Sequence, residues 1–119
     1  MAAGVVFTLL ASCATTPQRW KADLDCRAGD NAPAFTMPLN VRMNGRSEFV
    51  LELGTRGQPP YVHLQGFPDP DDRLQLSGEI TPPSGNPVKA TLEGRRDGKG
   101  YLVSGRVGGR DCTISLRLE

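Results

Sequence analysis

The sequence predicts an all-β fold: an eight-stranded antiparallel meander closed into a small barrel, with a two-sheet β-sandwich as the alternative. Three observations favour this class. Fourteen glycines and ten prolines in 119 residues disfavour long helices. Apolar side chains alternate with polar ones, at a period of two, in most of the chain from residue 20 to residue 118. Segments rich in Pro, Gly and Asp separate the alternating stretches, as turns and loops do.

The alternating stretches define eight candidate strands. Their apolar positions fall, in chain order, within residues 20–26, 39–43, 49–53, 62–64, 74–80, 88–92, 101–103 and 112–118. The segments expected to be loops are 27–34, 54–60, 67–71 and 81–87.

Three hairpin turns predict the register, because residues paired across a hairpin share a face and a slip of one residue would expose the core face. These turns and their pairs are an irregular Asn44-Gly45 turn with one extra residue (Val41 with Phe49), a type I′ Asp97-Gly98 turn (Arg96 with Lys99) and a tight Gly108-Gly109 turn (Val107 with Arg110). All three registers keep the apolar residues on one face.

A covalent staple is expected, because 38% apolar and 6% aromatic residues provide only a small aliphatic core. In a closed meander the first and last strands are antiparallel neighbours. Cys26 ends the first strand, Cys112 opens the last, and both share the inward phase. A disulfide between them would lock this seam. The alternative is two buried free cysteines.

The N-terminal segment predicts export. Residues 2–11 form an apolar run too short to cross a bilayer but suited to a signal sequence. Leu10-Ala11-Ser12-Cys13 resembles the lipobox of bacterial lipoproteins. We therefore interpret residues 1–12 as a lipoprotein signal peptide, 13–19 as a lipid-anchored linker and 20–119 as the barrel domain.

The lipobox resemblance implies that Cys13 carries diacylglycerol and an N-acyl chain such as palmitate, and that the protein is anchored in a membrane. Ala14, rather than Asp, follows the cysteine, which in such lipoproteins implies the periplasmic side of the outer membrane. Residues 1–10 lack the Lys or Arg with which such signals begin, which is consistent with a start codon farther upstream. The alternative is an N-terminal apolar strand with Cys13 as a buried thiol.

The remaining chemistry does not indicate an enzyme. His63, the single histidine, has the outward phase and no candidate nucleophile near it in sequence. We find no phosphate loop, nucleotide fingerprint or metal-ligand pair, so no cofactor or metal is expected. Fourteen basic residues against 13 acidic ones give no electrostatic reason to expect nucleic-acid binding.

Basic side chains gather around the last two predicted hairpins. Arg95, Arg96, Lys99 and Arg110 are the candidate residues of a docking patch for an acidic envelope protein or lipid headgroups. The alternative is a solvated rim in which arginines pair with neighbouring aspartates.

The predicted architecture, a lipid-anchored barrel with its first and last strands joined by a disulfide, resembles that of the membrane-bound inhibitors of c-type lysozyme. Those inhibitors carry a Ser-Gly-x-x-Tyr loop. Here Ser77-Gly78 matches its start and Thr81 replaces the tyrosine. We expect a non-enzymatic binding or envelope-structural lipoprotein; the alternative is an enzyme inhibitor, with Ser77 as its candidate contact residue.

Overall fold

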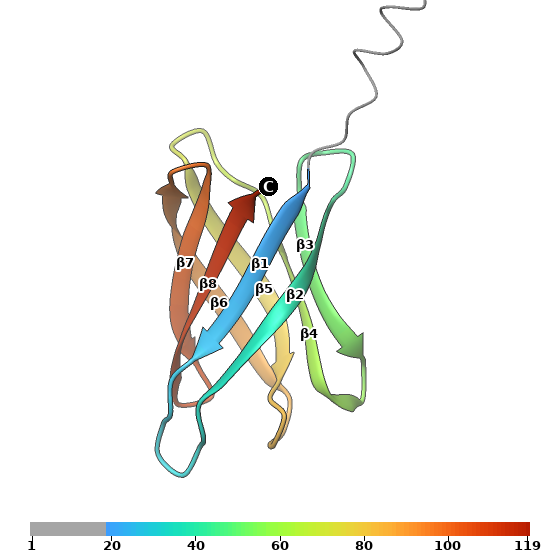
Figure 1. Cartoon of the computed structure of the whole chain (residues 1–119), viewed down its shortest axis with the longest axis vertical. Helices are drawn as coiled ribbons and strands as arrows, with labels where there is room; N and C mark the ends of the chain where they lie inside the picture. Colours follow the sequence, from blue (N-terminus) through green and yellow to red (C-terminus); the bar gives the residue numbers. More distant parts are fainter. Residues whose placement is uncertain (1–18) are drawn as a thin grey trace, which may run out of the picture.

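The computed structural model describes residues 19–119, which form a closed antiparallel barrel with its strands in sequence order (Figure 1). Its strands are β1 (Trp20–Cys26), β2 (Phe35–Met43), β3 (Phe49–Thr55), β4 (Gln58–Gly66), β5 (Arg73–Thr81), β6 (Val88–Asp97), β7 (Gly100–Val107) and β8 (Arg110–Leu118). The predicted eight-stranded meander is confirmed, and the sandwich alternative is wrong. The expected signal peptide and the lipid anchor at Cys13 lie outside the described residues. Within the described part of the chain, no helix has the length and hydropathy to span a membrane.

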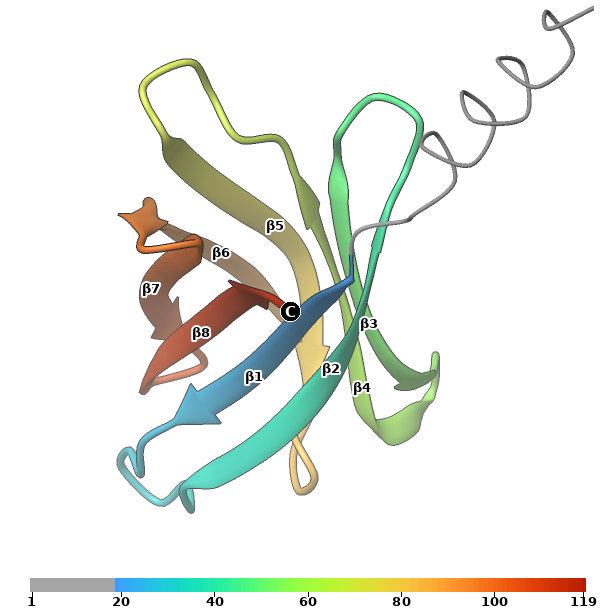
Figure 2. The same ribbon diagram turned by 45° about the horizontal axis from the view of Figure 1, so that its top comes forward.

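The barrel closes where β1 pairs with β8, which lie side by side in Figure 2. Paired residues run from Trp20 with Leu118 to Cys26 with Cys112. The predicted disulfide joins the last pair, with a sulfur–sulfur distance of 2.10 Å and a Cα–Cα distance of 4.1 Å. At this seam, a disulfide and a complete backbone ladder therefore hold the two ends of the sheet together.

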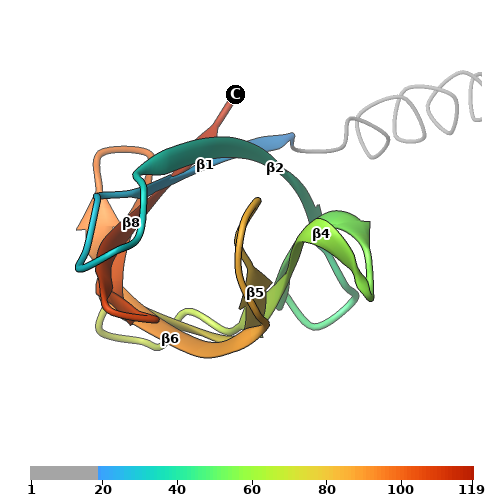
Figure 3. The same ribbon diagram turned by 90° about the horizontal axis from the view of Figure 1, so that it is seen from below.

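Antiparallel neighbours place successive connections at alternate ends of the barrel. The upper end in Figure 1 holds the start of β1, the end of β8 and the connections 44–48, 67–72 and 98–99. The lower end holds the disulfide and the connections 27–34, 56–57, 82–87 and 108–109. Seen from below, the 82–87 loop bends inward over the opening of the barrel (Figure 3).

The interior is filled by the side chains that the alternation predicts to face inward. They form one buried cluster of mainly Leu, Ile and Val. Near the upper end, Phe49 packs edge-on against Trp20 and Tyr101, with ring centroids 4.8 Å and 5.9 Å apart. An eight-stranded barrel is just wide enough to be filled in this way, so the core rather than a ligand occupies the interior.

The Gly108-Gly109 turn is confirmed. Val107 pairs with Arg110, and both glycines have positive φ angles, 57° and 81°, as a type I′ turn requires.

The predicted Asp97-Gly98 turn is wrong by two residues in register. Asp97 pairs with Gly100, so Gly98 and Lys99 are the central residues of the turn. Of these two only Gly98 has a positive φ, 60°, which suits the first central position of a type II′ turn. The shift of two leaves each side chain on its predicted face.

The connection after β2 is irregular, as predicted, but longer. Met43 pairs with Phe49, so the predicted pairing of Val41 with Phe49 is wrong by two residues. The Asn44 side chain explains the longer loop, because its Oδ1 accepts hydrogen bonds from the backbone N–H groups of Arg46 and Glu48, at 3.1 and 3.2 Å.

The prediction of a loop at residues 54–60 is wrong. β3 and β4 instead continue to a tight hairpin in which Thr55 pairs with Gln58. The register shifts beside Gly54, whose φ is 74°, and leaves Pro59 and Pro60 outside the regular ladder. A bulge tolerates proline because no ladder hydrogen bond is lost there.

We predict that replacing both seam cysteines by alanine lowers the free energy of unfolding by up to about 4–5 kcal/mol, since the bond closes a loop across a sequence separation of 86 residues. Urea denaturation of the full chain, with and without reductant, measures this loss. Cys13→Ala is the matched control and should leave the unfolding midpoint unchanged. Equal stability of the oxidised and reduced protein would contradict the role of the seam.

Candidate functional site

The structure divides the predicted basic patch between the two ends of the barrel. Arg95 and Arg96 lie near the end of β6 and Lys99 lies in the next turn, all at the upper end. Arg110 begins β8 at the lower end. The four residues therefore do not form one continuous surface.

Arg96 connects the 67–72 loop to the upper end of the barrel. Its Nε lies 3.2 Å from Asp72 Oδ1, its backbone N–H donates to the Asp72 carbonyl oxygen at 2.8 Å, and its guanidinium carbon lies 5.2 Å from the centre of the Tyr101 ring. The hydrogen bond to Asp72 and the attraction of Tyr101 raise the pKa of Arg96 above its usual value. Arg96 thus ties the 67–72 loop to the barrel as a permanent cation.

Arg95 faces outward and lies directly opposite Arg73 of β5. Neither arginine has a carboxylate within ion-pair distance among the residues that the structure describes. Beside them is Phe67, 51% exposed, at the edge of a hollow of about 550 Å³. We call this surface the outer groove. Glu93 and Asp69 also line it, so its charges are mixed.

Arg110 is withdrawn from the outer surface: it is only 6% exposed and shares the inward phase of β8. Its Nε donates a hydrogen bond to the Pro33 carbonyl oxygen at 3.0 Å, and its guanidinium carbon lies 5.2 Å from the centre of the Phe35 ring. It also lines a hollow of about 340 Å³ between the 27–34 and 82–87 loops. We call this the lower hollow.

Ser77 lies in the middle of β5, on the outer wall, where it pairs with Gln65 and Thr91. It is exposed but not on a loop, so it does not project toward a partner's cleft. Thr81, at the position of the motif's tyrosine, is 5% exposed.

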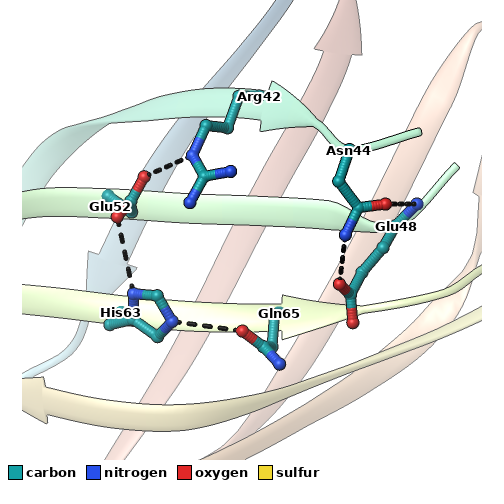
Figure 4. Close-up of polar contacts among 6 residues, drawn as sticks. All are labelled: Arg42, Asn44, Glu48, Glu52, His63 and Gln65. Carbon is teal, nitrogen blue, oxygen red and sulfur yellow. Dashed lines mark hydrogen bonds and ion pairs between the residues drawn. The ribbon is translucent and has the colours of Figure 1, made fainter. Parts of the chain in front are cut away.

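His63 belongs to a polar ladder on the outer wall of β2, β3 and β4 (Figure 4). Its Nε2 lies 3.1 Å from Gln65 Oε1 and its Nδ1 lies 3.6 Å from Glu52, which also pairs with Arg42 at 2.9 Å. Both ring nitrogens face amide or carboxylate groups and not a hydroxyl or thiol, so the contacts shown here do not form a nucleophile–base pair. Residues 19–119 contain no group of three or more His, Cys, Asp or Glu side chains that could hold a metal.

Arg73 and Phe67 were not predicted as site residues, and Arg110, predicted to belong to a basic surface patch, is buried. The inward phase of Arg110 could have been found, because it alternates with Cys112 and Ile114. The partnership of Arg73 with Arg95 needs the β5–β6 register, which no tight turn specifies.

Comparison of the chain with protein-family models, curated proteins and solved structures found no match. The barrel, its two ends and the side chains at those ends are therefore the basis for inferring a function.

We predict that Arg95→Gln raises the free energy of unfolding by about 0.2–1 kcal/mol, because it removes a like-charge pair directly across two strands. Urea denaturation at low salt measures the gain, which should shrink in about 1 M salt, where the screening length is about 3 Å. Arg96→Gln is the control and should lower the free energy of unfolding, since it removes the ion pair with Asp72. A destabilised Arg95→Gln protein would show that Arg95 has a favourable partner.

Proposed function

We propose that this protein is a lipoprotein held by Cys13 on the periplasmic side of the outer membrane, where its barrel acts as a non-enzymatic binding or envelope-structural module. One observation carries the proposal. The chain enters β1 at the upper end, whereas the lower hollow lies at the opposite end. A tether at Cys13 would leave the lower end facing the compartment and its partners.

The predicted linker supports this orientation. Residues 13–19 can span at most about 25 Å when fully extended, at roughly 3.6 Å per residue. The upper end would therefore stay close to the membrane surface. The outer groove has an exposed Phe67 and two arginines without an ion-pair partner among residues 19–119, lies toward that end and is suited to anionic headgroups.

A binding role is also supported by rigidity. The strands form a complete ring, the core is filled and the seam is covalently closed. Such a scaffold holds its end loops in fixed positions, so that little ordering entropy is lost when a partner binds.

Inhibition of c-type lysozyme is the second candidate function. The chain resembles the membrane-bound inhibitors of that enzyme in having an eight-stranded barrel whose first and last strands are joined by a disulfide. The position of Ser77 within β5 and the burial of Thr81 weaken this candidate, since they leave the Ser-Gly segment in the barrel wall.

We predict that Cys13→Ala moves the protein from the membrane fraction to the soluble fraction or leaves its signal peptide uncleaved, because the lipid can no longer be attached. Mass spectrometry of the wild-type N-terminal peptide should show an acylated Cys13. Thr15→Ala is the matched control and should remain membrane-bound. An unmodified Cys13 in correctly exported protein would overturn the anchor.

We expect the purified protein at micromolar concentration to leave the lytic rate of c-type lysozyme unchanged, since Ser77 lies within β5 and not on a loop. A turbidity assay on bacterial cell walls measures the rate. Inhibition that Ser77→Ala abolishes would favour the inhibitor function instead.

A further inference from the structure

The lower hollow contains the only buried cation of the described residues. Arg110 is 6% exposed, and no carboxylate of residues 19–119 lies within 4.0 Å of its guanidinium nitrogens. Buried charges are normally paired, because removing an ion from water costs several kcal/mol. The adjacent Asp111 faces outward and pairs with Arg106 at 3.4 Å. Arg110 therefore has no negative counterpart within the described chain.

The contacts of Arg110 leave part of its guanidinium group unused. The Nε donates to Pro33 and the ring of Phe35 covers one face. The two Nη nitrogens make no hydrogen bond within residues 19–119, yet they are not among the fully buried polar atoms without partners, so each keeps some exposed surface. The open space that Arg110 lines is the lower hollow. A planar guanidinium fork with free Nη groups matches the two oxygens of a carboxylate.

The loops around Arg110 hold this fork in place. A Cβ atom at Gly29 would lie 2.3 Å from the Gly109 carbonyl oxygen and 3.5 Å from Arg110 Cγ, so the 27–34 loop packs directly on the stem of the arginine and on the β7–β8 turn. The Cys26–Cys112 disulfide lies next to this loop, at the same end of the barrel. The donor groups are thus fixed before any ligand arrives, which lowers the entropic cost of binding.

The remaining walls indicate what accompanies the anion. Pro33, Pro82 and Val88 provide apolar contacts, whereas Asn31, Ser84 and Asn86 provide uncharged hydrogen-bonding groups. Arg110 is the one charged residue among those lining the hollow. A single cation complements a monovalent carboxylate better than a divalent phosphate, and amide and hydroxyl groups suit a peptide backbone.

From this arrangement we infer that the lower hollow binds the C-terminal carboxylate of a peptide chain, with Arg110 as the anion-binding residue. The inference deepens the proposed binding function by naming its ligand class. It does not depend on lipidation of Cys13.

The test uses the full chain in neutral detergent micelles, with N-acetyl-alanine as the probe and N-acetyl-alaninamide as its neutral counterpart. Nuclear magnetic resonance follows the backbone amides and the Arg110 Nε–H group. We expect saturable shifts confined to residues 27–34, 82–87 and 110 with the acid, with a Kd of about 1 mM for so small a ligand. Equal binding of the amide, tighter binding of inorganic phosphate, or no saturation up to about 50 mM acid would overturn the inference.

Two substitutions separate recognition from packing. Arg110→Met keeps the apolar stem and should abolish binding, whereas Arg110→Lys keeps the charge, loses the fork and should weaken binding by about tenfold or more. Arg106→Met is the matched control at the same end and should bind as the wild type does. If Arg110→Met does not fold, the lysine variant decides. Wild-type affinity in the lysine variant would assign Arg110 a structural role only. The result is independent of the fractionation experiment, so either proposal can fail alone.

Discussion

The pairing of β1 with β8 is the contact on which the rest of the barrel depends. These strands are the first and last of the sheet, so their ladder requires the six strands between them to curve around the core. Without it, two edge strands would expose their N–H and C=O groups and the aliphatic core would be open on one side. The disulfide at the lower end and the Glu119 N–H bond to the Arg19 carbonyl, 2.9 Å long at the upper end, bound this ladder on both sides.

Side-chain alternation explains how much of the fold could be predicted. Two of the three predicted registers were wrong by two residues, at Asp97-Gly98 and at Asn44-Gly45, yet every side chain kept its face because the period of a strand is also two. The inward set and the seam were therefore predictable even where the turns were not. The bulge at Gly54 was not predictable, because Pro59 and Pro60 are typical of a loop. They are tolerated in this hairpin because they lie outside the regular hydrogen-bonded ladder.

The candidate site was less predictable than the fold, because its parts come from different strands and loops. Arg95 and Arg110 were singled out for their charge, but charge alone gives neither the direction of a side chain nor its neighbours. The opposition of Arg73 and Arg95 depends on a register fixed by long-range pairing, and the cover over Arg110 comes from two loops whose conformation alternation does not specify. Long-range geometry, and not local sequence, creates both surfaces.

The two ends of the barrel then differ for a physical reason. At the upper end, Trp20, Phe49 and Tyr101 fill the interior, and Asp72 pairs with Arg96, whose guanidinium group lies over the Tyr101 ring. At the lower end, small and proline-rich loops leave a hollow, and the charge within it has no partner in the described chain. An ion pair whose charges are already satisfied gains little free energy from a ligand. A cation that is held in place and lacks some of its hydrogen-bond partners can bind an anion with little loss of entropy. Arg73 and Arg95 toward the upper end, which also lack an ion-pair partner among the described residues, are exposed, whereas Arg110 at the lower end is buried. The end opposite to the point where the chain enters the barrel is therefore the one whose buried cation favours a bound partner.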